Sequence, residues 1–264
     1  MISPLAYVDA SAKIGRDVTI HPFAYIDANT EIGDGCEIKP YASILSGTTL
    51  GRNVRVYQGA IIGAEPQDFR WKGEPTRCSV GDNTVIREQV IVNRSIRPDG
   101  VTSVGAECFL LAKTHIGHDS HIAPKCVLGN GVTVAGDVEI DEGTILSSNV
   151  IVHERSRIGK FVLVKGGTRI SSNVPPYTIM AHNPVVYYGV NSVIMGKHAG
   201  FTEEQIDDVA KAYRHIYQTS TSLFNALKRI EADIDDGVVR REILSFIRNN
   251  NYKIAAEHFD VGED

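Results

Sequence analysis

Residues 8–44 read VDASAKIGRDVTIHPFAYIDANTEIGDGCEIKPYASI, with an aliphatic side chain at every sixth position. A strict period of six matches neither an α-helix nor a single β-strand, but it fits short strands joined by turns, three of which close a triangular coil of about 18 residues. The sequence therefore predicts a parallel β-helix whose aliphatic side chains stack inside a prism. The uninterrupted series is Val8, Ile14, Ile20, Ile26, Ile32, Ile38, Ile44, Leu50, Val56 and Ile62.

The same period returns after each break in the series. Aliphatic residues stand at Val80, Ile86 and Val92, and then at every sixth place from Val104 to Ile170. Glycine often follows the aliphatic residue directly, and we expect it to provide the unusual backbone angles that tight turns need. These glycines are Gly15, Gly33, Gly51, Gly63, Gly81, Gly105, Gly117, Gly129 and Gly159.

Two polar segments interrupt the repeat, at about residues 64–79 and 94–103. Each is too long for a tight turn, so we expect external loops, where binding residues usually lie on a rigid scaffold. The repeat gives way to helical patterns after residue 190, beginning with a capping box at Thr202–Gln205. The prediction is a mainly β chain with a β-helix over 1–190 and a small C-terminal α-helical domain over 191–264.

Composition narrows the class of function. Charged residues make up 22% of the chain and the net charge is -5, which does not favour a nucleic-acid partner or a disordered acidic tail. The amino terminus lacks the pattern of a signal peptide, and no stretch approaches membrane-spanning length, so we expect a cytoplasmic protein without membrane insertion. The four cysteines form no CxxC pair, which argues against a zinc site or a disulfide framework.

Several polar residues should gather on one face of the prism. Stacking coils of about 18 residues brings His115, His118, Asp119, Asp137 and His153 to one region. Counting back one coil from the histidine at 118 reaches residue 100, so the second loop should lie beside this face.

This cluster has three interpretations. The first is an ordinary solvated surface, since outward positions tolerate any polar residue. The second is a zinc site formed by three histidines and nearby carboxylates. Side chains on an extended segment alternate in direction, so the histidines at 115 and 118 need not converge on one ion, and we predict no metal. The third is an acid-base site.

Sequence motifs in the interruptions carry a resemblance to a known family. The segment 66–76 reads PQDFRWKGEPT and is followed by Ile86–Glu88 and by His115–Asp119. These motifs, together with Val174–Tyr177 leading to Tyr188–Asn191, resemble the UDP-N-acetylglucosamine 3-O-acyltransferases of lipid A biosynthesis. The similarity covers essentially the whole chain. It implies the left-handed winding typical of hexapeptide-repeat transferases and an enzyme that moves a 3-hydroxyacyl chain from acyl carrier protein to the sugar.

The resemblance implies three catalytic residues. His118 would be the general base that removes the proton from the sugar 3-hydroxyl, and Asp119 would orient its imidazole. The backbone N–H of Gly136 would stabilise the oxyanion of the tetrahedral intermediate.

The resemblance also implies substrate contacts and partners. A homotrimer would form the site between its subunits, and no cofactor is expected beyond the phosphopantetheine arm of acyl carrier protein. Lys160, Lys165 and Arg169 are basic residues that could meet this acidic partner. Gly166 stands where the family limits acyl chain length. The expected substrate-binding residues are Gln67, Asp68, Arg70, His115, Asp137, His153, Gly166, Asn191, Lys197 and His198.

The chain departs from the family pattern at three places. Arg70 replaces a lysine, Asp137 replaces a histidine beside the oxyanion-hole glycine, and segment 191–200 lacks an expected acidic residue and a pair of arginines. These departures leave rivals open: a paralogue that acylates a 3-amino sugar, whose ammonium could pair with Asp137 or Asp68, and a non-catalytic scaffold. A hexapeptide-repeat carbonic anhydrase with zinc between subunits is the third rival.

Overall fold

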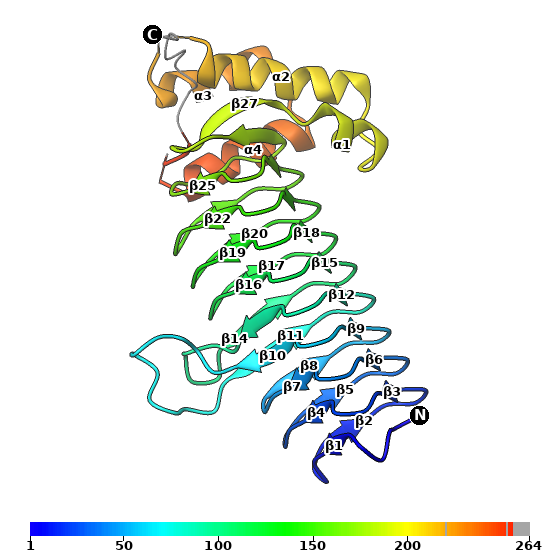
Figure 1. Cartoon of the computed structure of the whole chain (residues 1–264). Helices are drawn as coiled ribbons and strands as arrows, with labels where there is room; N and C mark the ends of the chain where they lie inside the picture. The colour runs from blue at the N-terminus through cyan, green and yellow to red at the C-terminus, as the bar shows by residue number, and fades with distance from the viewer. Residues whose placement is uncertain (220, 252, 256–264) are drawn as a thin grey trace, which may run out of the picture.

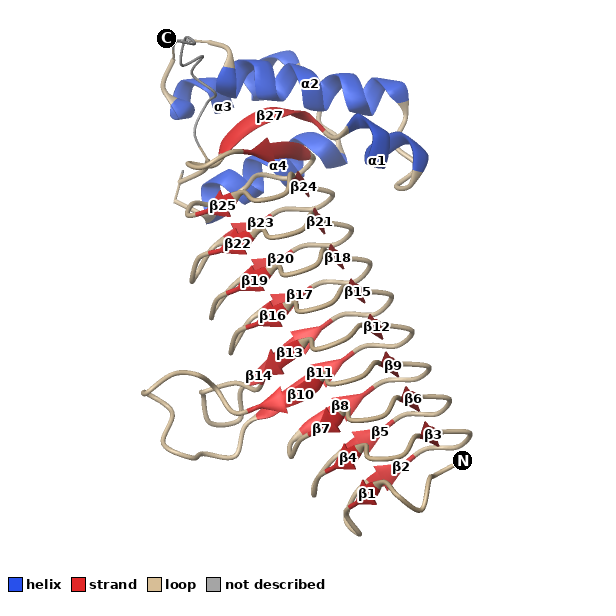
Figure 2. Cartoon of the chain, viewed as in Figure 1, coloured by secondary structure: helices blue, strands red, loops and turns tan. Residues whose placement is uncertain are grey.

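The computed structural model describes residues 1–219, 221–251 and 253–255. Short strands wind into a prism, and helices lie at its carboxyl-terminal end (Figure 1). Figure 2 shows how the strands line up as sheets along the prism axis. The fold is a left-handed parallel β-helix followed by helices: the repeat predicted the β-helix, and the family resemblance implied its left-handed winding.

Three sheets form the sides of the prism, and we number them in chain order. Sheet 1 contains β1 (Tyr7–Val8), β4 (Tyr25–Ile26), β7 (Ser43–Ile44), β10 (Ile61–Ala64), β13 (Ile91–Asn93), β16 (His115–Ile116), β19 (Thr133–Val134), β22 (Ile151–Val152) and β25 (Arg169–Ile170). Sheet 2 contains β2 (Lys13–Ile14), β5 (Glu31–Ile32), β8 (Thr48–Leu50), β11 (Arg77–Val80), β14 (Val101–Val104), β17 (His121–Ile122), β20 (Glu139–Ile140) and β23 (Arg157–Ile158). Sheet 3 contains β3 (Thr19–Ile20), β6 (Glu37–Ile38), β9 (Arg55–Val56), β12 (Val85–Ile86), β15 (Phe109–Leu110), β18 (Val127–Leu128), β21 (Ile145–Leu146), β24 (Leu163–Val164), β26 (Thr178–Ala181) and β27 (Val186–Val190).

The register of the sheets follows the repeat. Val8 pairs with Ile26, and His115 pairs with Thr133, so on coils without a loop each strand residue lies beside the one 18 positions away. The two loops lengthen this separation to 30 positions for Ile61 and Ile91 and to 24 for Ile91 and His115. The second residue of each pair of strand positions points inward, because strand side chains alternate in direction. Ile20, Ile26 and Ile38 are fully buried in this way, and Cys36, Cys108 and Cys126 are small buried residues of the same core.

The glycines that follow the aliphatic residues do not serve the predicted purpose. Of the nine, only Gly63 has a positive φ, at 79°. The others permit close stacking instead: a Cβ built on Gly33 would lie 2.5 Å from the carbonyl oxygen of Gly51 on the next coil. Positive φ occurs two residues later, at positions such as Asp17 and Asn53, where a short polar side chain tolerates it.

Gly105→Ala should therefore destabilise the prism. Its Cβ would lie 2.5 Å from the backbone nitrogen of Pro124, and the coils must separate to accept it. We expect a loss of about 1–3 kcal/mol, seen as a lower thermal unfolding midpoint. Gly196→Ala is the matched control, because its nearest neighbour would be Ile206 Cδ1 at 3.5 Å. Equal midpoints for the two variants would contradict this account of the glycine positions.

Two loops leave the prism on the same side, between β10 and β11 (residues 65–76) and between β13 and β14 (residues 94–100). Backbone and side-chain contacts join them: Asn93 Nδ2 donates to the Glu65 carbonyl at 2.6 Å, and the Arg94 guanidinium lies 5.2 Å from the centre of the Trp71 ring. The loops therefore form one structure beside the middle coils.

The carboxyl-terminal helices are α1 (Ser192–Lys197), α2 (Glu203–Tyr217), α3 (Leu223–Asp233) and α4 (Val238–Asn249). The predicted capping box is present: Gln205 N–H donates to Thr202 Oγ1 at 3.2 Å, and Thr202 N–H donates to Gln205 Oε1 at 2.9 Å. The sequence did not predict α1 or the antiparallel pairing of β26 with β27. Across the described residues, we find no helix with the length and apolar character needed to cross a membrane.

Candidate active site

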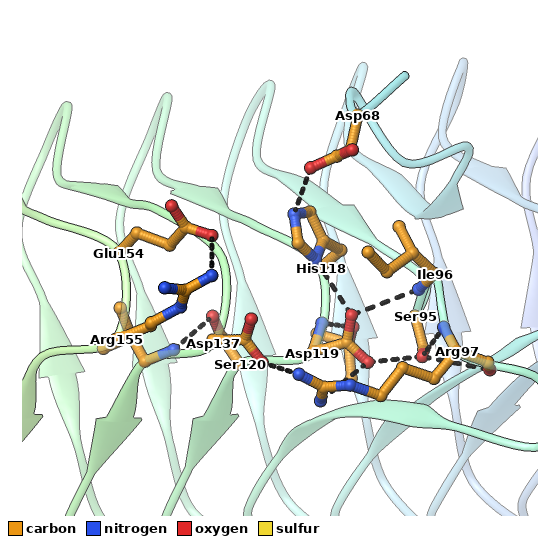
Figure 3. Close-up of polar contacts among 12 residues, drawn as sticks. Asp68, Ser95, Ile96, Arg97, His118, Asp119, Ser120, Asp137, Glu154 and Arg155 are labelled. Atoms are coloured by element: carbon orange, nitrogen blue, oxygen red, sulfur yellow. Dashed lines mark hydrogen bonds and ion pairs between the residues drawn. The ribbon is translucent and has the colours of Figure 1, made fainter. Parts of the chain in front are cut away.

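His118 lies at the corner of the prism where the chain passes from β16 in sheet 1 to β17 in sheet 2. Its backbone is held by the next coil, since Asp137 N–H donates to the His118 carbonyl at 3.0 Å. The ring nitrogens face two carboxylates: Nδ1 lies 2.9 Å from Asp119 Oδ2, and Nε2 lies 3.4 Å from Asp68 Oδ2 (Figure 3). The imidazole is nearly buried, with 10% of its side chain exposed.

Asp119 is fixed by the second loop as well as by His118. Ser95 Oγ donates to Oδ1 at 2.5 Å, and Ile96 N–H donates to Oδ2 at 3.2 Å. Arg97 Nη1 adds an ion pair at 3.4 Å to Oδ1. Burial alone would raise the pKa of the Asp119 carboxyl, but the hydrogen bonds from Ser95 and His118 outweigh burial and lower the pKa. Asp119 is therefore an ionised partner for the imidazole, and the second loop holds its carboxylate in place.

Gly136 makes room for the imidazole. A Cβ built on Gly136 would lie 2.5 Å from His118 Cε1 and 2.6 Å from Nε2. The ring thus packs directly on the glycine backbone, one coil further along the prism. Within the part of the chain that the structure describes, the Gly136 N–H has no hydrogen-bond acceptor. This amide is available to a ligand.

Asp68 comes from the first loop and approaches His118 from the opposite side to Asp119, as Figure 3 shows. Arg70 holds it with several bonds, including one from Nη2 to Oδ2 at 2.7 Å and one from the backbone N–H to Oδ1 at 2.8 Å. Hydrogen bonds from the Arg70 side chain and backbone hold the pKa of Asp68 well below its usual value. Arg70 also reaches Glu154 at 3.4 Å, which ties the loop to a later coil.

Asp137 does not point freely into the site. Its carboxylate accepts a hydrogen bond from Arg97 Nη2, and its backbone carbonyl accepts one from Arg157 Nη1 at 2.6 Å. Arg97 therefore bridges two carboxylates, those of Asp119 and Asp137. The sequence analysis did not predict Arg97 or Ser95 as site residues. Two signals could have indicated them: a buried carboxylate such as Asp119 needs a cation or hydrogen-bond donors, and the second loop was expected beside this face.

The expected position of that second loop was right, but the residue count was wrong. Ile91 pairs with His115, a separation of 24 positions, because the loop adds residues to this coil. Counting back one coil from His118 therefore does not reach Gly100. The contacts come instead from Ser95, Ile96 and Arg97.

The other predicted substrate residues lie at different distances from this centre. His115, on β16, is half-buried, and burial together with the nearby His118 lowers the pKa of its ring. Gln67 is exposed on the first loop. His153 Nε2 accepts a hydrogen bond from Arg169 Nε at 2.6 Å, and the two residues lie on successive coils.

Four predicted residues lie nearer the helical end of the prism. Gly166 is exposed, and a Cβ built there would lie 3.1 Å from the Ser148 carbonyl oxygen. Asn191 is buried, and its side-chain amide donates to the Phe161 carbonyl at 2.8 Å, so this N–H is already used. Lys197 and His198 are exposed at the end of α1.

The zinc interpretation receives no geometric support. Among residues 1–219, 221–251 and 253–255, no group of three or more histidine, cysteine, aspartate or glutamate side chains could hold a metal ion. Instead, the nitrogens of His118 face Asp119 and Asp68, and Nε2 of His153 is taken by Arg169.

Comparison with known proteins shows the family of this chain. The family model described as "Udp N-acetylglucosamine O-acyltransferase; Domain 2" matches residues 173–255, and the model "GMPPB C-terminal domain" matches residues 2–97. An acyl-acyl-carrier-protein–UDP-N-acetylglucosamine O-acyltransferase of Chlorobaculum parvum is 48% identical over 93% of both chains. The protein of the same name from Xylella fastidiosa is 39% identical over 94% of both chains.

Solved structures that resemble this chain are also UDP-N-acetylglucosamine acyltransferases. A UDP-N-acetylglucosamine acyltransferase from Bacteroides fragilis is 40% identical, has a TM-score of 0.93, and is matched over 98% of this chain and 100% of its own. The enzyme of Francisella novicida is 31% identical with a TM-score of 0.92, over 100% of this chain and 99% of its own. This chain, with its histidine set between two carboxylates at a corner of the prism, therefore belongs to the family of acyl-acyl-carrier-protein–UDP-N-acetylglucosamine O-acyltransferases.

Proposed function

We propose that this acyltransferase moves a 3-hydroxyacyl chain from acyl carrier protein to the 3-hydroxyl of UDP-N-acetylglucosamine, the first step of lipid A biosynthesis. The names of its relatives support the reaction and the substrates. The observation that carries the mechanism is the position of His118, with Nδ1 at Asp119 and Nε2 facing outward towards Asp68. A proton on Nδ1 would be shared with Asp119, which leaves Nε2 free to act as a base.

The proposed reaction has two stages. Nε2 of His118 takes the proton of the sugar 3-hydroxyl while that oxygen bonds to the thioester carbonyl carbon. The resulting oxyanion is stabilised by the free N–H of Gly136. The tetrahedral intermediate then collapses, the carbon–sulfur bond breaks, and the departing thiol sulfur receives the proton from His118. The products are an ester on the sugar and the free thiol of the carrier arm, so no further reactant is needed.

Sugar recognition is assigned to the residues around this base. Asp68, 3.4 Å from Nε2, would accept hydrogen bonds from sugar hydroxyls, and Arg70 would keep it ionised while lying near the phosphates. Gln67 and His115 would help to position the nucleotide sugar. The contributions of His153 and Asn191 stay predictions, and in the case of Asn191 only the side-chain oxygen remains for a ligand, because Nδ2 donates to Phe161.

The choice between a hydroxyl and an amine acceptor rests on Asp137. An ammonium group on a 3-amino sugar would require a free carboxylate, whereas Asp137 is paired with Arg97 and Asp68 with Arg70. This pairing favours UDP-N-acetylglucosamine over its 3-amino analogue.

An assay of the purified protein tests the function. UDP-N-acetylglucosamine and its 3-amino analogue are each offered with hydroxyacyl carrier proteins of several chain lengths, and products are identified by mass. We expect an ester of the natural sugar to form fastest. Absence of transfer to either sugar would favour the scaffold alternative, and stoichiometric zinc whose removal abolishes turnover would favour the carbonic-anhydrase alternative.

We also propose that the protein is a homotrimer that packs through sheet 3. The outward residues of this sheet change from Thr19, Glu37 and Arg55 on the first coils to a continuous apolar column on the later ones. Neighbouring partners along the column are in register and half-buried, which is typical of a surface that another subunit covers. The column consists of Val85, Phe109, Val127, Ile145, Leu163 and Ile179.

Ile145→Glu should disrupt this assembly, because it places a charge in the middle of the column. Light scattering of the unaltered protein should give about three times the chain mass of 28.8 kDa, and the variant should give a lower mass and lose transfer. Thr49→Glu, on the exposed face of sheet 2, is the control and should remain trimeric. A trimer of undiminished stability in Ile145→Glu would place the interface elsewhere.

Acyl carrier protein is the proposed donor partner. Lys197 and His198 are exposed and could meet its acidic surface, whereas Lys160 is paired with Glu242 at 2.5 Å and Lys165 lies over the Tyr188 ring. Gly166 would leave room for a long acyl tail. The cytoplasmic location and the absence of a bound cofactor stay predictions.

A further inference from the structure

Each carboxylate beside the His118 imidazole has its own arginine. Asp68 lies 3.4 Å from Nε2 and is bonded to Arg70 at 2.7 Å. Asp119 lies 2.9 Å from Nδ1 and is paired with Arg97 at 3.4 Å. Arg70 belongs to the first external loop and Arg97 to the second, so the charges around the ring depend on the positions of both loops. Figure 3 shows Arg97 beside Asp119.

This arrangement matters because a base must be unprotonated to accept a proton. Two carboxylates within ion-pairing distance of one imidazole favour its protonated form, and a protonated imidazole cannot start the reaction. A guanidinium beside each carboxylate offsets this effect without removing the orienting hydrogen bond. Asp119 then still orients the ring through Nδ1, while Nε2 faces Asp68.

Arg97 pairs with a second carboxylate, that of Asp137, in addition to Asp119. Its Nη2 donates to Asp137 Oδ1, and Asp137 is largely enclosed, with 13% of its side chain exposed. The backbone of the same loop supplies the Ile96 N–H to Asp119, and Arg97 N–H donates to Ser95 Oγ at 2.9 Å. The guanidinium, although 58% exposed, therefore spans two fixed carboxylates on neighbouring coils.

We propose that Arg97 is a positioning residue that spans Asp119 and Asp137, holds the second loop on the catalytic coil, and offsets the negative charge of the carboxylate that orients the His118 imidazole. The proposal rests on the role of His118 in the proposed function. The proposal also assigns a role to Asp137. Its carboxylate pairs with Arg97 and holds that side chain beside the site, so its negative charge is compensated near the developing oxyanion.

Other groups near His118 also affect the charge around its imidazole. Asp68 approaches from the first loop, with Arg70 and, beyond it, Glu154 at 3.4 Å. His115 on β16 interacts with His118 through the electrostatic field. Gly136 on the next coil carries no charge. Substitutions of Arg97 and Asp137 change the charge near the imidazole without removing a side chain that contacts the ring.

The test compares four variants by two measurements. Arg97→Gln removes the positive charge, Arg97→Lys retains it, and Asp137→Asn removes the negative charge that faces it. Arg155→Gln is the matched control, because Arg155 lies one coil from Asp137 and contacts Glu154 at 3.7 Å but neither Asp119 nor Asp137 side chain. The measurements are the pH profile of kcat/KM and an NMR titration of ring-labelled histidine, with the His118 signal identified by its loss in His118→Ala.

The expected shifts have opposite signs. In Arg97→Gln the acidic limb of the profile and the His118 titration should move up together by about 0.5–1 pH unit, a screened value for a partly exposed charge. Transfer below the midpoint should then fall by about three- to tenfold. Arg97→Lys and the Arg155→Gln control should follow the unaltered protein. Asp137→Asn should move both measurements to lower pH.

The outcomes separate this proposal from the proposed function. Unchanged titration and profile in Arg97→Gln, with normal transfer by the unaltered protein, would overturn the role of Arg97 alone. A shift of Asp137→Asn in the same direction as Arg97→Gln would also overturn it, since either loss would then act only by loosening the loop. The predicted NMR shifts in a protein that transfers no acyl group would support the charge balance and contradict the function.

Discussion

His118→Ala is expected to lose turnover by about a hundredfold to ten-thousandfold, the usual contribution of one general base. The backbone at this corner is held by Asp137 N–H, and the His118 side chain is not part of the hydrophobic core, so the fold should persist. The measurement is kcat under saturating sugar nucleotide, with circular dichroism and light scattering to confirm fold and assembly. KM should change less than kcat, because the lost interaction belongs to the transition state.

His121→Ala is the control for this prediction. His121 is three residues further along, lies exposed on sheet 2, and pairs with Ser103 Oγ at 2.8 Å without contacting the site. It should retain near-normal turnover. Near-normal turnover in His118→Ala itself would overturn the general-base role.

Gly136→Ala should have the second-largest effect, about a hundredfold in kcat, since misplacing a catalytic group by about 1 Å costs this much. The new methyl group would lie 2.5 Å from His118 Cε1, so the ring must leave its position against Asp119. The backbone N–H proposed for the oxyanion is retained in this variant. The loss should therefore report ring displacement and not the removal of a hydrogen-bond donor.

A double-mutant cycle separates these two causes. Combining Gly136→Ala with His118→Ala should cost little more than His118→Ala alone, because a missing ring cannot be displaced. Gly196→Ala, in a helix remote from the prism corner, supplies the control for an added methyl group. If the double variant instead loses the full product of the two single effects, Gly136 acts independently of the imidazole.

The sequence predicts the prism well because its core follows one rule at every coil. An inward aliphatic residue at each sixth place leaves a single register, and Val8, Ile26 and Ile44 do stack as neighbours. The same regularity brings His118 beside Gly136 one coil away. The six-residue period does not extend into the external loops. The contacts of Ser95 and Arg97, which lie in the second loop, could therefore not be predicted from the repeat.

Short irregular elements were also beyond the sequence. Helix α1 has six residues and no side-chain cap from Asn191, so neither a capping signal nor a helical period marks it. The pairing of β26 with β27 depends on the end of the prism offering an edge to the returning chain. Asn191 shows the limit of a motif: its identity matches the family, but its amide holds the Phe161 carbonyl.

The two ends of the prism differ in how much neighbouring structure supports them. Helices pack on the last coils, whereas Val8 and Ile14 on the first coil are only half-buried and gain a neighbour on one side. Because coils in a stacked array depend mainly on those next to them, fraying will start at the amino-terminal end and stop within a few layers. His118 lies several coils from the amino-terminal end, so local unfolding of the first coils should leave the candidate active site intact.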